Sequence, residues 1–332
     1  MSVPRKYKVA GISIEKTRTA QISISTNEMS VSGSEFVGNE VEYSVGNAVI
    51  IIGASSVPGL GHSIARRFAK AKFSIGIIGR NEEGLRNCAQ KIREEWTGDT
   101  GLICAYRSID VKEKDKVRYG LEDLLQELKG PHADVRLKAL IYNASGKPYP
   151  LTLLEDVDFS RLVYDYHSAV VGFSNVIQWC LPKFVRWTPK SDPGQAKSTC
   201  IPGTRSCYHE KIGTIIVTGS KASTEGMPHF ASFCAAKAAL RSLSFSLAKE
   251  CLHRGIHVAH VLIDGVINNE LLIQALSTER DYLDHPGFSM APEHIANVYW
   301  FLYKQPIQCP TLEVDLRSPS SWAPVIEEKI TS

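Results

Sequence analysis

Residues 48–61 read AVIIIGASSVPGLG, a continuous apolar run that ends at Gly53 and continues through Gly59 and Gly61. An apolar run of this length, ended by glycine, is typical of a buried strand. The following stretch, GLGHSIARRFAKA, places Leu60, Ile64, Phe68 and Ala71 at helical spacing. The sequence therefore predicts a strand, a glycine-rich turn and a helix in direct succession.

The same alternation continues along the chain. Further apolar runs of strand length occupy residues 73–79, 102–109, 137–143, 213–219 and 256–263. Segments with helical periodicity separate them. Because buried strands that alternate with helices form a parallel sheet covered on both faces, we expect one doubly wound α/β domain from residue 48 to residue 317.

Three other segments do not follow this pattern. Residues 1–47 are rich in Ser and Thr with early basic residues, and they fit a flexible extension, a targeting segment, or a small hairpin of residues 11–15 and 21–25. Residues 188–211 contain three prolines without periodicity, which indicates an inserted loop. Residues 318–332 are expected to form a C-terminal tail.

Composition excludes several classes of function. A net charge of +3 without a basic block argues against nucleic acid as a partner, and no apolar run approaches the ~20 residues that span a bilayer. The eight cysteines show no CxxC pair and no metal-ligand spacing, so we expect no metal site. We predict a cytoplasmic protein, with a mitochondrial location as the lesser alternative. Reduced thiols in the core are expected at Cys88, Cys104, Cys180, Cys234 and Cys251.

The glycine-rich turn has a chemical interpretation. Glycines after a strand let the backbone approach a pyrophosphate, whose charge is favoured at the N-terminus of the next helix. The alternative is a tight turn without a ligand.

At the end of the next strand, in IIGRN, Arg80 would accept a 2′-phosphate, which favours NADP over NAD. A solvated arginine is the alternative there.

The stretch FASFCAAKAAL, residues 230–240, holds one charge among small and apolar residues. A lysine on a helix usually turns its charge to water. Phe233 and Lys237 are four residues apart, so on a helix they share one face. Which way this face points cannot be decided from the stretch itself.

Several motifs in order resemble the short-chain dehydrogenase/reductase family. They are GASSVPGLGHSIA from residue 53, RN after the second strand, IDV at 109–111, YNASG at 142–146, and Ser220 followed by Lys237. The resemblance is closest to a divergent subgroup, and it extends over residues 48–317. It implies a Rossmann-type, mostly parallel, seven-stranded sheet and an NADP(H)-dependent oxidoreductase, with NAD as the alternative cofactor.

The resemblance assigns roles residue by residue. It implies that the three turn glycines bind phosphate, that Asp110 caps the adenine, that Ser220 hydrogen-bonds a substrate carbonyl and that Lys237 binds the nicotinamide ribose. The implied cofactor-binding residues are Gly53, Ser55, Gly59, Leu60, Gly61, Arg80, Asp110, Val111, Asn143, Lys237, Gly265 and Ile267. The implied catalytic positions are Ser220, Lys237 and Phe233.

The sequence also departs from the family. Five residues separate Gly53 from Gly59, where the family usually has three. Phe233 occupies the position of the catalytic tyrosine and has no proton to give. The helix asparagine of the proton relay falls at or near Ala169. The usual Pro-Gly is replaced by Asp264-Gly265, and Asn269 replaces a threonine.

Two functions follow. The first is an oxidoreductase with altered acid-base chemistry, acting on a small carbonyl, an alcohol or an activated double bond. The second is a cofactor-binding protein without turnover, a sensor or partner subunit. His229, Tyr208 and His209 are candidate substitute proton donors, and an ordinary loop residue is the favoured alternative at each position. The resemblance also implies a homodimer or homotetramer formed by the helices of residues 155–185 and 233–252.

Overall fold

The structure of the chain is a computed structural model that divides into two units, residues 1–41 and 42–332, and each is described by itself. It describes residues 8–9, 12–13, 46–98, 102–129, 135–144, 153–184, 211–269 and 289–319.

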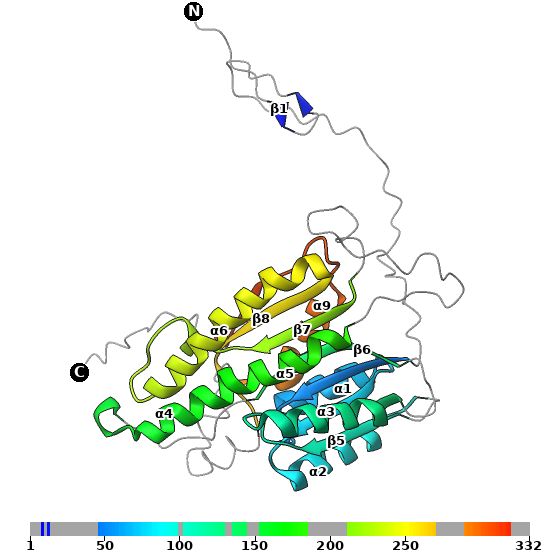
Figure 1. The fold of residues 1–332 in the computed structure, drawn as a ribbon, viewed down its shortest axis with the longest axis horizontal. Helices are drawn as coiled ribbons and strands as arrows, with labels where there is room; N and C mark the ends of the chain where they lie inside the picture. The colour runs from blue at the N-terminus through cyan, green and yellow to red at the C-terminus, as the bar shows by residue number, and fades with distance from the viewer. Residues whose placement is uncertain are drawn as a thin grey trace, which may run out of the picture. The chain divides into compact units, whose positions relative to one another are not determined.

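The larger unit is built on a seven-stranded parallel sheet, which confirms the predicted fold (Figure 1). Its strands are β3 (Asn47–Ile52), β4 (Ser74–Gly79), β5 (Cys104–Ser108), β6 (Arg136–Tyr142), β7 (Gly213–Thr218), β8 (Ile256–Asp264) and β11 (Glu313–Arg317). Their order is β11-β8-β7-β6-β3-β4-β5. The chain therefore leaves β3 in one direction and later returns to its other side, which opens a crevice at the carboxyl ends of the strands.

Helices cover both faces of this sheet. The helices are α1 (Leu60–Ala69), α2 (Glu82–Glu94), α3 (Lys114–Lys129), α4 (Phe159–Tyr166), α5 (Gly172–Cys180), α6 (Ala231–Cys251) and α9 (Pro292–Lys304). Ile50 and Ile52 pack with α3, α5 and α6, whereas Val49 and Ile51 pack with α1, α2 and α9. Because both sides of β3 are buried, its residues are apolar without alternation, as the sequence shows.

Shorter elements connect these layers. They are 3₁₀ turns at η1 (Leu154–Asp156), η3 (Leu181–Lys183), η5 (Lys221–Ser223) and η6 (Leu252–Arg254), a π-helical turn η2 (His167–Val171), and the parallel pair β9 (Val266–Ile267) and β10 (Ser289–Met290). The π-helical turn joins α4 to α5.

The smaller unit has a different hairpin from the predicted one. The prediction paired residues 11–15 with residues 21–25. In the structure, Ile12–Ser13 (β2) instead pairs antiparallel with Lys8–Val9 (β1). Residues 21–25 lie outside the described residues. So do the predicted insertion at 188–211, apart from Lys211, and the predicted tail beyond residue 319.

The five cysteines predicted for the core are all buried. Burial raises the pKa of the Cys104 thiol to about 12, and the pKa of Cys88 is also raised, so both remain protonated thiols at neutral pH.

Among the helices of the described segments, none combines the length and the hydropathy needed to cross a bilayer.

Candidate functional site

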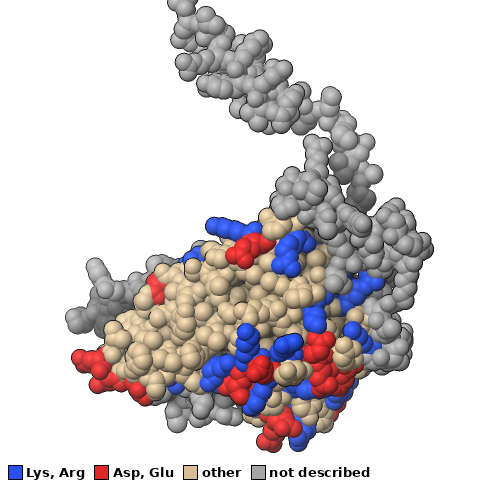
Figure 2. All heavy atoms as spheres, viewed as in Figure 1, with Lys and Arg blue, Asp and Glu red and all other residues tan. Residues whose placement is uncertain are grey.

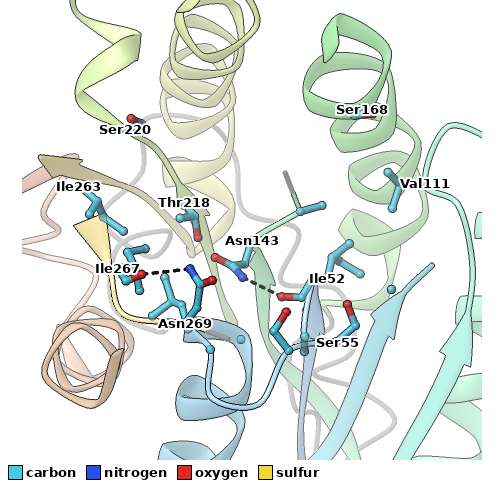
Figure 3. Close-up of a pocket in the computed structure, with 18 of the residues that line it drawn as sticks. Ile52, Ser55, Val111, Asn143, Ser168, Thr218, Ser220, Ile263, Ile267 and Asn269 are labelled. Carbon is cyan, nitrogen blue, oxygen red and sulfur yellow. Dashed lines mark hydrogen bonds between the residues drawn. The ribbon is translucent and has the colours of Figure 1, made fainter. Parts of the chain in front are cut away.

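A cavity of about 530 Å³ lies at the carboxyl ends of the strands (Figure 3). Every residue predicted for the site lines it: Gly53, Ser55, Gly59, Leu60, Gly61, Arg80, Asp110, Val111, Asn143, Ser220, Phe233, Lys237, Gly265 and Ile267. The structure thus brings the glycine-rich turn and the lysine of α6 to one cavity. The roles of these residues remain predictions.

The glycine-rich turn is closely packed against the neighbouring strand. Gly53 has a φ of +96°, and a Cβ there would lie 2.7 Å from the backbone carbon of Asn143. The side-chain amide of Asn143 donates a hydrogen bond of 2.7 Å to the carbonyl of Gly53. A Cβ on Gly61 would collide with the carbonyl of Gly53, so α1 starts directly against the strand end. These positions require glycine, and they turn the N-terminus of α1 toward the cavity.

The longer spacing between the first two glycines is accommodated at the neighbouring strand. Ser55 and Ser56 both line the cavity. The Cβ of Ser55 lies 3.3 Å from where a Cβ of Gly79 would be, and the Ser55 carbonyl lies close to Gly84 at the start of α2. The additional residues therefore extend the turn toward the end of β4 and keep it part of the cavity wall.

The wall at the ends of β4 and β5 is charged. The guanidinium of Arg80 donates a hydrogen bond to the hydroxyl of Tyr164 on α4. The Lys112 ammonium lies 4.0 Å from the centre of the Tyr164 ring and 3.3 Å from Oδ2 of Asp110. Arg80 and Asp110 both line this end of the cavity, and Lys112 lies behind them against Asp110 and Tyr164. A guanidinium can pair with a phosphate, and a carboxylate can accept hydrogen bonds.

Lys237 is buried in the wall of the cavity. It is 6 % exposed, and its Nζ donates a hydrogen bond of 3.1 Å to the carbonyl of Thr218. The same Nζ lies 5.6 Å from the centre of the Phe233 ring, so the two side chains share a face of α6 as predicted. Burial lowers the pKa of Lys237 to about 8. The lysine is therefore not a charge turned to water.

The shifted pKa of Lys237 makes a prediction about stability. Between pH 8 and its ordinary pKa of 10.5, the unfolded chain holds a proton that the folded chain has released, so stability rises with pH through this window. Lys237→Met removes the cost of burying the charge. We expect the variant to unfold at higher denaturant than the wild type, with an advantage about 2 kcal/mol larger at pH 7 than at pH 9.5.

Urea unfolding of the wild type and of Lys237→Met at the two pH values measures the difference in their free energies of unfolding. Other titrating groups affect both proteins equally, so their contribution cancels in this difference. A pH-independent difference would contradict the burial of a charged Lys237.

Ser220 begins a turn at the edge of the cavity. Its Oγ accepts from the backbone N–H of Ala222 at 3.3 Å, which fixes the start of η5, and its carbonyl accepts a 2.6 Å hydrogen bond from the hydroxyl of Ser223. Figure 3 shows Ser220 at one end of the cavity, with Ser168 across from it. Hydroxyl groups therefore border the cavity from two sides.

The structure describes one of the three candidate proton donors. His229 is exposed, with a φ of +66°, and it is not among the residues that line the cavity, so it is placed as an ordinary loop residue and not as a proton donor. The other proposed donors, Tyr208 and His209, lie outside the described residues. Asn269 does line the cavity, and its amide donates to the carbonyl of Ile267.

Ser168 lines the cavity but was missed in the sequence, where Ala169 was the expected position. Ser168 lies in the π-helical turn η2, whose extra residue per turn changes which side chains face the cavity. A π-helical turn has no clear sequence signal, and π turns are frequent at functional sites.

Comparison with known proteins gives matches over most of the chain. The profile of the short chain dehydrogenase family matches residues 47–195 and 199–278. An uncharacterized oxidoreductase of Mycobacterium bovis is 26% identical over 217 residues, which are 65% of this chain and 54% of that protein. The chain thus spans about half the length of this relative. A 3-oxoacyl-[acyl-carrier-protein] reductase of Chlamydia trachomatis is 23% identical over 227 residues, 68% of this chain and 76% of the reductase.

Solved structures share the fold. ElxO with NADP bound superposes with a TM-score of 0.61, at 18% sequence identity, over 81% of this chain and 96% of ElxO. This likeness shows that the arrangement of strands and helices is shared.

Proposed function

The chain belongs to the short-chain dehydrogenase/reductase family, and we propose that it is an NADP(H)-dependent oxidoreductase. Its reaction would transfer a hydride to or from a small carbonyl, an alcohol or an activated double bond. The observation that carries the proposal is the convergence of the glycine-rich turn, Arg80, Ser220 and Lys237 on one cavity. The bound cofactor would supply the hydride.

The residues present fit a dinucleotide. A Cβ on Gly53 or Gly61 would collide with neighbouring backbone, so glycine at both positions lets the strand end, the turn and the start of α1 pack closely together. The N-terminus of α1, which lines the cavity through Leu60 and Gly61, would hold the pyrophosphate. Asp110 and Val111 would hold the adenine, and Arg80 would pair with a 2′-phosphate. Lys237 would donate to the hydroxyls of the nicotinamide ribose.

Phe233, which carries no proton, is predicted to stand at the position of the family's catalytic tyrosine, so the acid-base chemistry that we propose differs from the family pattern. We assign the proton to the ammonium of Lys237, whose pKa of about 8 lies close to neutral pH. A general acid works best when its pKa is near the operating pH. The Ser220 hydroxyl would hold the carbonyl oxygen, and the proton would leave Nζ for that oxygen as the alcohol forms.

The names of relatives favour the reduction of carbonyls. The chlamydial protein is named as a 3-oxoacyl-[acyl-carrier-protein] reductase, and ElxO is described with NADP bound. These names support a carbonyl substrate and NADP as working hypotheses for this chain.

Turnover tests the proposal. Purified protein with NADPH and a panel of aldehydes, ketones and 3-oxoacyl thioesters should consume NADPH, followed by absorbance and by product analysis. Tight NADPH binding without consumption on any substrate would favour the second function, a sensor or partner subunit without turnover. Absence of binding to NADPH and NADH at micromolar protein would contradict the whole proposal.

Arg80 should decide between the two cofactors. Arg80→Gln removes the cation that would pair with the 2′-phosphate, so we expect NADPH to bind at least about tenfold more weakly while NADH binding changes little. The ratio of the two dissociation constants, from cofactor fluorescence, measures the effect. Arg86→Gln, an exposed arginine on α2 paired with Glu82, is the matched control and should leave the ratio unchanged. An unchanged ratio in Arg80→Gln would assign NADP selectivity elsewhere.

The face formed by α4, α5 and α6 is nearly free of charged side chains, as Figure 2 shows. The exposed positions of α6 are small up to its last turn, where Lys249 and Glu250 are exposed; the small ones are Ala235, Ala238, Ser242 and Ser246. Small residues let another helix approach closely. We extend the proposal to a homodimer or homotetramer that uses this face, with a mass in solution that is a multiple of 36.7 kDa.

A further inference from the structure

A buried histidine lies behind the wall of the cavity. His260 on β8 is 1 % exposed, and its Nδ1 lies 2.8 Å from Oε2 of Glu313 on β11. Arg241 on α6 donates two hydrogen bonds to the same carboxylate, at 2.6 and 2.8 Å. Because a carboxylate held by an arginine accepts hydrogen bonds, Nδ1 of His260 is assigned as the protonated nitrogen.

The other nitrogen of the ring faces the cavity wall. Nε2 of His260 is buried, and no hydrogen-bond partner is found for it among the described residues. A Cβ on Gly219 would collide with Cε1 and Nε2 of this imidazole. Gly219 lines the cavity, and the carbonyl before it, that of Thr218, accepts the hydrogen bond from Lys237. The imidazole therefore touches the backbone that holds the lysine.

The charge of Lys237 also acts on the pKa of His260. Burial is the largest cause that lowers the pKa of His260, to about 4, and the Lys237 ammonium lowers it further. The charged groups that act on the ring are Lys237 and Arg241 from α6 and Glu313 from β11. The ring of Phe245 packs edge-on against the imidazole, with the two ring centres 6.0 Å apart. At neutral pH the imidazole is thus uncharged, and Nε2 keeps a free lone pair.

We propose that His260 is a positioning residue that stabilises the protonated form of Lys237. Glu313 fixes the imidazole with its Nε2 lone pair toward the Thr218–Gly219 backbone, and the negative end of this dipole favours a positive charge on the lysine that the Thr218 carbonyl holds. The consequence for catalysis rests on the proposed function, since it keeps a proton on the group assigned as the acid. The effect on the charge of Lys237 does not depend on a bound cofactor.

The test measures the titration of Lys237 in the full chain without cofactor. Protein labelled with ¹³C at lysine Cε gives one NMR signal per lysine, and the Lys237 signal is the one that Lys237→Met removes. In the wild type this signal should titrate with a midpoint near pH 8. In His260→Phe, which keeps a ring and removes the polar nitrogens, we expect the midpoint to fall by about one pH unit.

His260→Gln is the matched control, because its amide can donate to Glu313 and offer an oxygen toward the backbone. It should keep the midpoint within about 0.3 unit of the wild type. Equal midpoints in the wild type and His260→Phe, or equal shifts in the phenylalanine and glutamine variants, would overturn the proposal. If His260→Phe does not fold, Glu313→Gln is measured in its place. We expect a smaller fall in the Lys237 midpoint for this variant, and an unchanged midpoint would overturn the proposal.

These outcomes are separate from the proposed function. A shifted midpoint in a protein that binds no NADPH would retain the role of His260 and reject the oxidoreductase, and an unshifted midpoint in an active enzyme would do the reverse.

Discussion

Phe233→Tyr should raise the rate of NADPH-dependent carbonyl reduction about a hundredfold, because it supplies a positioned general acid. The Phe233 ring lines the cavity and lies 5.6 Å from the Lys237 ammonium. A hydroxyl on this ring would extend into the cavity beside a cation, which lowers the pKa of a phenol and makes it a better proton donor near neutral pH. The gain should be in kcat, since binding of the substrate need not change.

The measurement compares kcat of the wild type and the variant on the best carbonyl of the panel. Phe233→Leu is the control for altered packing, and it should not gain activity. If the tyrosine variant reduces carbonyls no faster than the leucine variant, then Lys237 and Ser220 do not form a site that an added acid can complete. Activity only in the tyrosine variant would mean that the natural chain binds a cofactor without turnover.

Gly61→Ala should abolish most of the affinity for NADPH, with a loss of about a hundredfold or more. The new Cβ would meet the carbonyl of Gly53 and the backbone of Ala54, neither of which can move without displacing the start of α1 from the strand end. This displacement would remove the helix N-terminus from the position that we propose for the pyrophosphate. Overpacking of this kind also costs about 1–3 kcal/mol of stability.

Fluorescence titration with NADPH measures the loss, and urea unfolding separates it from instability. Gly226→Ala is a matched control, because a Cβ there meets no atom within 4 Å. Unchanged affinity in the Gly61→Ala protein, at a concentration where it is folded, would show that the cofactor does not use the N-terminus of α1.

Sequence reasoning predicted the parts of this molecule that local chemistry dictates. Strands such as Asn47–Ile52 are buried on both faces, so an unbroken apolar run identifies them without any tertiary information. The turn from Gly53 to Gly61 could be predicted as part of the cavity because glycines after a buried strand permit a tight turn and a close approach of the backbone to a ligand. The position of Lys237 in the cavity wall could not be predicted from local sequence, since only the family resemblance indicated which face of its helix was buried.

The remaining features depend on contacts between distant segments. Glu313 meets His260 because β11 pairs with β8 in a register that the sequence does not specify. Ser168 lines the cavity from within a π-helical turn that the sequence does not signal. His229 is exposed and has a left-handed backbone, a conformation that is hard to foresee for a residue other than glycine.

The pairing of β11 with β8 has a consequence for the order in which the molecule is made. The glycine-rich turn follows the first strand of the sheet, whereas the carboxylate that orients His260 arrives on the last. During synthesis on the ribosome, the strands from β3 to β8 emerge while the imidazole still lacks its partner. A nascent chain can therefore form the glycine-rich half of the cavity early, and the hydrogen bond that fixes the imidazole behind Lys237 can form only when β11 docks on β8.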